Sequence, residues 1–187
     1  PHINSHIADA PLQRKKYGFH SFITNLGFRF SKVILSNSHA GLESYGVTDE
    51  KCRVIYNGIR LERFSDLPDK ESIKAKFNIR TAYTVIMVAS FTSKKKYGQF
   101  LDVAEFMSGI RSDITFLGVG DFKEEITESE KIRIRAEKIQ NVMLCQKIDS
   151  VESLVNACDI GILLTYSEGL SNSIIEYMAC GKPVIAN

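Results

Sequence analysis

The sequence predicts an α/β protein with a doubly wound parallel sheet, preceded by part of a smaller domain. From residue 84 onward, apolar segments of strand length alternate with segments of helical periodicity, which is the pattern of successive βα units. The first of these segments, Thr84–Ala89, is almost continuously apolar, as expected for a central parallel strand covered on both faces. A content of 44% apolar and 25% charged residues is that of an ordinary globular protein.

Charge and composition exclude several classes of function. The net charge of +2 gives no reason to expect nucleic acid as a partner. No apolar run approaches the roughly 18 residues that a membrane-spanning helix needs, and no signal peptide is expected. The four histidines lack the spacing of metal ligands, so no metal site is expected. Four cysteines without a C-x-x-C pair predict reduced thiols in a cytoplasmic protein.

Residues 1–56 are interpreted as the end of a first domain. Residues 1–15 have no clean period and contain two prolines, so they are expected to form a loop. A helix is expected over about residues 17–30, because an apolar stripe recurs there at helical spacing: Phe19, Phe22, Ile23, Leu26 and Phe30. Strands are expected at 33–35 and 53–56, with a helix between them that Ser38 caps and that ends near Gly46.

Residues 57–68 are interpreted as a linker, because Asn57-Gly58 and a polar stretch through Pro68 interrupt the pattern. The second domain, 69–187, opens with a helix that starts at Asp69 or Ser72. Its strands are expected at 84–89, 114–117, 142–145, 159–164 and 184–186. The helices between them are expected at 97–107, 122–138, 151–158 and after a polar loop, 169–173. Since the sequence begins without Met and stops within a strand pattern, we expect a fragment of a longer chain.

Two carboxylates, Glu168 and Glu176, flank that polar loop at the end of the fourth strand. Ligands of open parallel sheets bind at the carboxyl ends of the strands, and a helix start attracts anions. Ser173 and Glu176 also have the spacing of a capping box, which leaves a purely structural role open for Glu176. Glu168 has no such structural explanation and is the stronger candidate for chemistry.

Two further segments lie at the same predicted edge of the sheet. Lys94-Lys95-Lys96 follows the first strand and could neutralise a diphosphate, although a solvated loop has the same composition. Gly118-Val-Gly120 follows the second strand and could be either a phosphate-binding turn or a tight turn of small residues. It lacks the third glycine of a dinucleotide fingerprint, which argues against a nicotinamide-dependent dehydrogenase.

Three blocks of sequence resemble glycosyltransferase family 4 (group 1). The block from Glu168 to Ala186 resembles the E-x7-E signature, Val54–Phe64 resembles the "VI-NG(I/V)…F" segment, and Ser36–Leu42 resembles the "S-S-A" segment. The resemblance covers about residue 30 to the end. It implies a GT-B architecture of two Rossmann-like domains, of which this chain would hold mainly the C-terminal donor-binding domain and a remnant of the N-terminal, acceptor-side domain.

The resemblance also implies an activity. Such enzymes move a hexose-type sugar from a nucleotide-sugar to a glycan or lipid-linked acceptor in polysaccharide biosynthesis. They retain the anomeric configuration and use neither a metal nor a cofactor. Peripheral contact with the inner face of the membrane would come from the first domain, where the acceptor-side catalytic residues also largely lie. The fragment alone is expected to bind a nucleotide weakly and to transfer no sugar.

The family's functional residues carry over to particular positions. Glu168 would contact the donor sugar, Glu176 would hold the ribose hydroxyls, and Lys95 would neutralise the diphosphate. The resemblance assigns contacts with the diphosphate and sugar to the intervening loop and helix start: Gly169, Leu170, Ser171, Asn172 and Ser173. Ser90 stands where many members of the family carry an arginine.

Two alternatives stay open at this stage. A nucleotide-sugar epimerase of the same architecture would interconvert free nucleotide-sugars without any acceptor. A non-catalytic nucleotide-binding module would bind the same ligand without catalysing a reaction.

Overall fold

The computed structural model describes residues 2–11, 18–122, 126–146 and 148–187. The chain consists of two compact units. Unit 1 comprises Pro1–Gly58 and Tyr166–Ser171, and unit 2 comprises Ile59–Thr165 and Asn172–Asn187. A short segment of the predicted site, Tyr166–Ser171, therefore groups with unit 1, although the chain on both sides of it belongs to unit 2.

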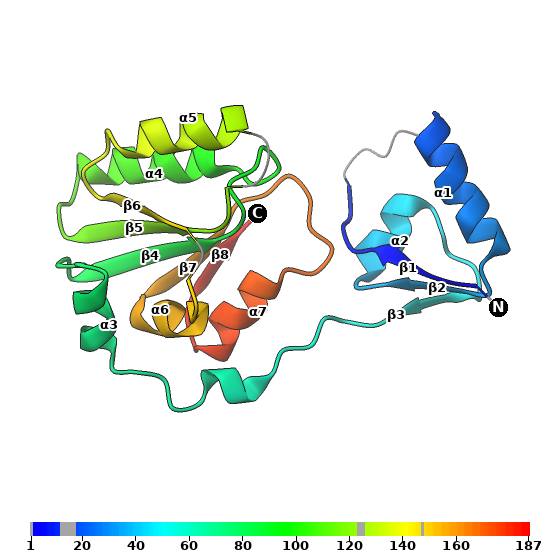
Figure 1. Ribbon diagram of the computed structural model, residues 1–187, viewed down its shortest axis with the longest axis horizontal. Helices are drawn as coiled ribbons and strands as arrows, with labels where there is room; N and C mark the ends of the chain where they lie inside the picture. The colour runs from blue at the N-terminus through cyan, green and yellow to red at the C-terminus, as the bar shows by residue number, and fades with distance from the viewer. Residues whose placement is uncertain (1, 12–17, 123–125, 147) are drawn as a thin grey trace. The chain divides into compact units, whose positions relative to one another are not determined.

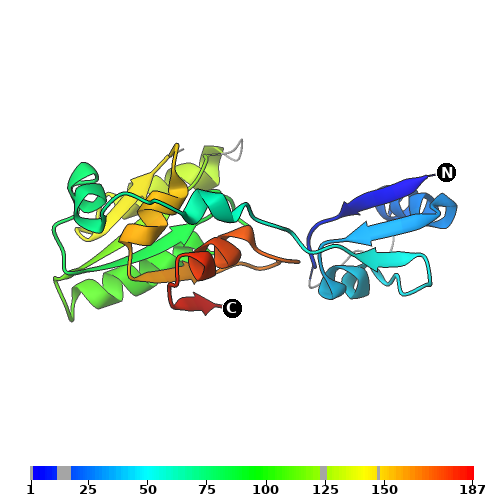
Figure 2. The ribbon, with the colours of Figure 1, turned by 90° about the horizontal axis from the view of Figure 1, so that it is seen from below.

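Unit 1 contains a parallel sheet of three strands in the order β1-β2-β3 (Figure 2). The strands are β1 (Ile3–Ile7), β2 (Val33–Ser36) and β3 (Cys52–Val54). Two helices, α1 (Phe19–Phe30) and α2 (His39–Tyr45), contribute to one core cluster together with β1 and β2. That cluster is built from Ile7, Phe28, Ile34 and Leu42.

The expectation of a loop over residues 1–15 is wrong for Ile3–Ile7, which forms β1 and pairs in parallel with β2. Only Ile7 of this strand is fully buried. The strand therefore lacks the alternation of apolar and polar residues that identifies a strand in a sequence. Residues 1 and 12–15 of that expectation lie outside the described part of the chain.

The helix expected near 17–30 is confirmed at Phe19–Phe30, but its apolar stripe does not face the core of unit 1. Phe19 and Phe30 are 81% and 70% exposed, and Phe22, Ile23 and Leu26 are exposed as well. The buried positions are Ser21, Thr24 and Phe28. Thr24 can be buried because its hydroxyl donates to the carbonyl of His20 at 2.9 Å within the same helix. Helical periodicity thus identified the helix but not the face that packs.

Helix α2 begins and ends at its predicted residues. The Ser38 hydroxyl accepts a hydrogen bond from the Gly41 amide at 3.0 Å, which satisfies one of the amides left unpaired at a helix start. Gly46 ends the helix in the left-handed conformation, with φ of 66°.

Unit 2 is organised around a parallel sheet of five strands in the order β6-β5-β4-β7-β8 (Figure 1). Their bounds are β4 (Tyr83–Val88), β5 (Ile114–Val119), β6 (Val142–Cys145), β7 (Ile160–Leu163) and β8 (Val184–Ala186). The apolar segment predicted to be a central strand is β4, which pairs with β5 on one side and β7 on the other. The order reverses on the two sides of β4, so the predicted doubly wound sheet is confirmed.

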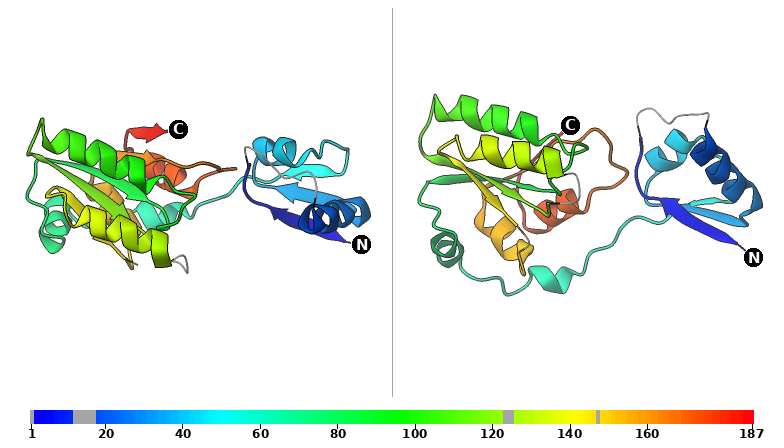
Figure 3. Two further views of the ribbon diagram at one scale, coloured as in Figure 1. Left: turned by 90° about the horizontal axis from the view of Figure 1, so that it is seen from above. Right: turned by 45° about the horizontal axis from the view of Figure 1, so that its top comes forward.

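Helices cover both faces of this sheet. On one face α4 (Tyr97–Ser108) and α5 (Ile126–Ala136) lie side by side (Figures 1 and 3). On the other are α3 (Lys70–Lys76), α6 (Val151–Ala157) and α7 (Asn172–Ala179).

A 3-10 helix, η1 (Leu61–Phe64), precedes α3. Of the two proposed starts for α3, the structure selects Asp69, whose carboxylate accepts from the amides of Glu71 and Ser72. The helix expected over 122–138 is shorter, and its residues 123–125 lie outside the described part of the chain.

One close packing contact fixes α7 against the sheet. The ring of Tyr177, which is fully buried, lies against the backbone of Gly161 in β7. A Cβ atom on Gly161 would lie 2.4 Å from two carbon atoms of that ring, which is far inside van der Waals contact. Only a residue without a side chain therefore allows this helix to pack so closely on β7.

We predict that Gly161→Ala destabilises the protein by about 2–3 kcal/mol, because the tyrosine ring and α7 must move to admit the methyl group. Urea denaturation followed by circular dichroism measures the change. Gly98→Ala is the matched control, since Gly98 lies in α4 with no atom near its added Cβ, and there alanine should be neutral or slightly stabilising. Equal stabilities for the two variants would contradict the packing argument.

Candidate functional site

The carboxyl end of β4 is held by two side chains of α7. The Val88 amide donates to the Tyr177 hydroxyl at 2.7 Å, and that hydroxyl donates to the carbonyl of Ile162 in β7 at 3.3 Å. The Ser173 hydroxyl donates to the Val88 carbonyl at 2.6 Å. Val88 is the last residue of β4. These hydrogen bonds place the first turn of α7 at the edge of the sheet where parallel α/β proteins bind ligands.

Ser173 and Glu176 do not form the capping box that their spacing left open. Helix α7 begins at Asn172, so Ser173 lies within its first turn rather than before it. The hydroxyl of Ser173 donates to a strand carbonyl instead of accepting from its own helix, and the carboxylate of Glu176 pairs with Arg63. The sequence spacing is that of a capping box, but both side chains have partners in other elements.

Lys95 follows β4 in a segment that is tied to the carboxyl end of β7. Lys95 forms an isolated antiparallel bridge with Thr165, and the Thr165 hydroxyl donates to the Lys94 carbonyl at 3.2 Å. The next amide, that of Lys96, donates to the Leu164 carbonyl at 2.9 Å. Lys95 and Ser90 are both half-buried. The three-lysine segment is therefore not a fully solvated loop, because its backbone is fixed between the ends of two neighbouring strands.

The predicted loop residues Glu168, Gly169, Leu170 and Ser171 belong to unit 1. The Leu170 carbonyl accepts from the side-chain amide of Asn57 at 3.3 Å. A Cβ atom on Gly169 would lie 2.5 Å from the side-chain oxygen of Asn37 and 3.1 Å from the Ala8 carbonyl. Gly169 is thus required for the close approach of this loop to the rest of unit 1.

The predicted site residues consequently fall into two groups. Within unit 2 the structure brings Ser173 onto the end of β4, close in sequence to Ser90, and fixes the Lys95 segment on the neighbouring strand β7. Asn172 and Glu176 belong to the same unit. Glu168 to Ser171 are held within unit 1 through Asn57 and the contacts of Gly169.

A cluster of three charged residues in unit 2 includes Glu176 and was not predicted as a site. Arg63 of η1 hydrogen-bonds to Glu152 of α6 at 2.9 Å, and it forms an ion pair with Glu176 of α7 at 3.6 Å. Arg63 and Glu152 are 89 positions apart. Their pairing gives no signal in the sequence, because neither spacing nor periodicity links a linker residue to two later helices.

The two carboxylates of this cluster differ in their proton affinity. Burial raises the pKa of Glu176 above its ordinary value, the charge of Arg63 opposes this rise, and the charge of Glu152 adds to it. Burial acts on Glu152 in the same direction and is the largest single cause, but the hydrogen bond from Arg63, a backbone hydrogen bond and the charge of Arg63 together outweigh it and leave the pKa of Glu152 lowered. Arg63 therefore stabilises mainly the Glu152 carboxylate, and Glu176 is the less well compensated charge.

Close packing accounts for both glycines of Gly118-Val-Gly120. A Cβ atom on Gly118 would lie 2.6 Å from the side chain of Leu144. On Gly120 it would overlap the carbonyl of Ala89, which follows β4. These contacts favour the tight turn of small residues over a phosphate-binding turn.

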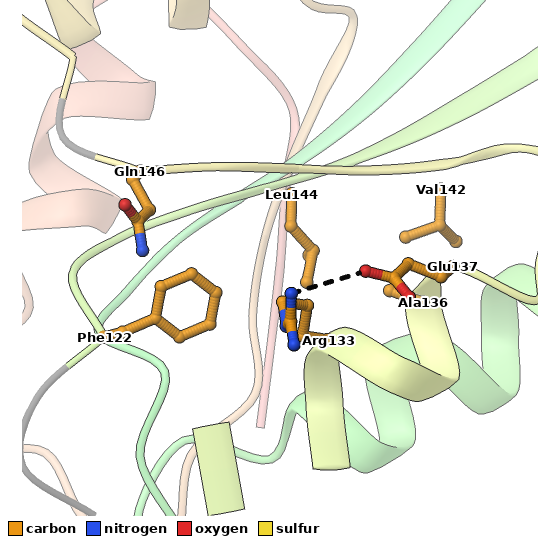
Figure 4. A pocket seen from close by; sticks show the side chains of 7 residues that line it. All are labelled: Phe122, Arg133, Ala136, Glu137, Val142, Leu144 and Gln146. Carbon is orange, nitrogen blue, oxygen red and sulfur yellow. Dashed lines mark ion pairs between the residues drawn. The ribbon is translucent and has the colours of Figure 1, made fainter. Parts of the chain in front are cut away.

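A hollow of about 340 Å³ lies beside α5 and β6 (Figure 4). It is lined by Phe122, Arg133, Ala136, Glu137, Val142, Leu144 and Gln146. Arg133 and Glu137 form an ion pair at 3.8 Å along α5. None of the predicted site residues lines this hollow.

In the described ranges no group of three His, Cys, Asp or Glu could hold a metal ion. No helix in those ranges is long and apolar enough to cross a membrane.

Comparison with known families gives one match of wide extent. The family described as "Glycosyl transferases group 1" matches residues 82–187, which is more than half of the chain. The match begins just before β4 and continues to the last residue, so it contains the whole parallel sheet of unit 2.

Two curated relatives come from Campylobacter jejuni. The N,N'-diacetylbacillosaminyl-diphospho-undecaprenol alpha-1,3-N-acetylgalactosaminyltransferase is 27% identical over 170 residues, covering 87% of this chain and 44% of the relative. The N-acetylgalactosamine-N,N'-diacetylbacillosaminyl-diphospho-undecaprenol 4-alpha-N-acetylgalactosaminyltransferase is 24% identical, covering 88% and 43% respectively. The chain thus spans less than half the length of each. Both relatives are named as transferases.

Among solved structures, Anabaena HepE in complex with UDP-glucose matches with a TM-score of 0.84 at 21% identity. The match covers 98% of this chain and 52% of the HepE chain. A likeness at this level of identity concerns the fold. The chain has the fold of about half of a GT-B glycosyltransferase, as the sequence predicted.

We predict that Tyr177→Phe lowers the free energy of unfolding by about 1–3 kcal/mol, because the partly buried amide of Val88 loses its acceptor. Thermal and urea denaturation measure the loss. Tyr56→Phe removes a hydroxyl from a ring that is 61% exposed and should leave stability unchanged. A Tyr177→Phe variant as stable as the unmodified protein would refute the role given to this hydroxyl.

We also predict that Glu176→Gln stabilises the protein at pH 7 and that this gain disappears in acid. The folded protein binds the Glu176 proton more tightly than the unfolded chain does, since the pKa is raised above 4.5. Glu176 therefore favours folding below about pH 4.5, and this contribution is lost as the pH rises through the raised pKa. Melting temperatures measured between pH 4 and pH 8 test the sign. Glu130→Gln on the exposed side of α5 controls for the loss of one negative charge, and a destabilised Glu176→Gln at pH 7 would contradict the assignment.

Proposed function

Since this chain belongs to the group 1 glycosyl transferases, we propose that it is the donor-binding part of a retaining, metal-independent hexosyltransferase. The donor is a nucleotide-sugar, and the acceptor is a glycan or a lipid-linked sugar. The names of the Campylobacter relatives support a lipid-linked acceptor, and the UDP-glucose held by HepE supports a nucleotide-sugar donor. No cofactor takes part. The complete protein works in the cytoplasm at the inner face of the membrane.

In the proposed reaction the bond from the anomeric carbon of the sugar to the diphosphate oxygen breaks, a bond from that carbon to the oxygen of an acceptor hydroxyl forms, and the hydroxyl proton passes to solvent. The nucleoside diphosphate leaves with an additional negative charge. Catalysis therefore requires positive charge and amide donors at the diphosphate. Residues that stabilise this charge accelerate the reaction only as far as they bind the leaving group more strongly than the intact donor.

The observation that carries the proposal is the arrangement at the carboxyl ends of β4 and β7. The first turn of α7 is fixed on Val88 by Ser173, and the Lys95 segment is fixed on Thr165 and Leu164. A lysine and a helix start at one edge of a parallel sheet supply the cation and the backbone amides that a diphosphate needs.

Each remaining residue has a proposed role in this donor site. Glu168 contacts the donor sugar, and Glu176 accepts hydrogen bonds from the ribose hydroxyls. The diphosphate and sugar are bound along the loop and helix start: Gly169, Leu170, Ser171, Asn172 and Ser173. Ser90 lies beside the diphosphate, where its hydroxyl is a neutral donor in place of the arginine common in the family.

We predict that the 187-residue chain binds one of UDP, GDP and ADP in the micromolar to millimolar range, and that Lys95→Ala weakens this binding about ten-fold or more. Removing a cation from a partly desolvated diphosphate costs about 1.5–3 kcal/mol, the value of a charge-assisted hydrogen bond. Isothermal titration calorimetry measures the affinities. Lys131→Ala makes the same change in net charge on α5 and should bind as the unmodified chain does.

Two results would overturn the proposal. One is an absence of binding by all three nucleotides to a chain that circular dichroism shows to be folded. The other is an equal loss of affinity in Lys95→Ala and Lys131→Ala, since general electrostatic attraction would then account for the binding.

A further inference from the structure

The three-residue cluster of Arg63, Glu152 and Glu176 contains one positive and two negative charges. The hydrogen bond from Arg63 to Glu152 is 2.9 Å long, whereas its ion pair with Glu176 spans 3.6 Å. The second distance exceeds that of an ordinary hydrogen bond. Arg63 thus hydrogen-bonds to Glu152 through Nη2, while its Nη1 faces Glu176 at the distance of an ion pair.

The Glu176 carboxylate is enclosed but retains the capacity to accept hydrogen bonds. Its side chain is only 16% exposed, so few water molecules can solvate it. Within the described residues, its polar contact is the long ion pair with Arg63. Buried carboxylate oxygens usually accept several hydrogen bonds, because an unpaired charge is expensive to bury. The cluster therefore lacks hydrogen-bond donors to the Glu176 carboxylate. The donors that it needs are ones that add no further positive charge.

A purely structural connection between the linker, which contains η1, and the helices would not need the carboxylate of Glu176. Arg63 already joins η1 to α6 through Glu152. Adding Glu176 introduces a like charge near Glu152, which works against folding. A hydroxylated ligand would compensate for it, because hydroxyl groups donate hydrogen bonds and carry no charge.

We propose that Arg63 is a positioning residue for ribose recognition: fixed by Glu152, it keeps Glu176 ionised and oriented to accept hydrogen bonds from the two hydroxyls of a nucleotide ribose. This inference rests on the proposed function, in which Glu176 contacts the ribose. It adds a residue from the segment before the parallel sheet, Arg63, to the determinants of donor specificity. Arg63 itself does not touch the nucleotide.

The test compares each nucleotide with its form that lacks both ribose hydroxyls. The most tightly bound of UDP, GDP and ADP and its 2′,3′-dideoxy derivative are titrated into the 187-residue chain by calorimetry. The ribose preference is the ratio of the two affinities. The unmodified chain should prefer the ribonucleotide about ten-fold or more, the discrimination expected of hydrogen bonds to a charged group.

Arg63→Met should reduce this preference to about three-fold or less by weakening the ribonucleotide alone. Arg63→Lys, which keeps the positive charge, should restore part of it. Arg111→Met is the matched control, since Arg111 is also paired with a carboxylate, Asp113, but lies before the amino end of β5. It should leave both affinities unchanged. Circular dichroism and melting temperature establish whether each variant is folded. If Arg63→Met does not fold, Arg63→Lys serves as the test.

The possible results separate the inference from the function on which it rests. If Arg63→Met weakens both nucleotides equally, or leaves the preference intact, Arg63 is only structural and the inference fails. If Glu176→Gln abolishes the preference while Arg63→Met retains it, the role of Glu176 stands and that of Arg63 is refuted. If Glu176→Gln keeps the preference, or the unmodified chain has none, the ribose contact itself is wrong and the inference falls with it.

Discussion

The hydroxyl of Tyr177 is the contact on which the geometry of the proposed donor site depends. It accepts from the last residue of the central strand, Val88, and donates to the neighbouring strand at Ile162. Tyr177 is fully buried, and these hydrogen bonds fix α7 against both β4 and β7. The ring can reach this position only because Gly161 has no side chain. Every site residue on α7 takes its position from this contact.

The charged cluster shows how a site can oppose stability. Helix α7 presents Glu176 to an arginine that is already hydrogen-bonded to Glu152. The helix would be easier to bury with a neutral side chain at this position. A poorly compensated carboxylate is consistent with the binding role proposed for Glu176. Stability in unit 2 comes instead from the apolar clusters on the two faces of its sheet.

The two units differ in how completely they bury their apolar side chains. In unit 2 both faces of the sheet are covered by helices, with fully buried residues such as Phe100 and Leu154 on opposite faces. In unit 1 three phenylalanines of α1, Phe19, Phe22 and Phe30, are exposed, and its buried positions include Ser21 and Thr24. The family match also differs, since it begins at residue 82 and lies outside unit 1 except for Tyr166–Ser171.

The sequence by itself determined the fold class, the central position of β4, the helix caps at Ser38 and Gly46, and the family, because periodicity, turn residues and contiguous motifs are local properties. Only the tertiary structure decided which face of α1 packs, that Ile3–Ile7 is a strand, and that Ser173 and Glu176 bond to other elements rather than to each other. The pairing of Arg63 with two later helices belongs to this second group. Such contacts join residues far apart in the chain, and their partners are chosen by packing, about which spacing along the sequence carries no information.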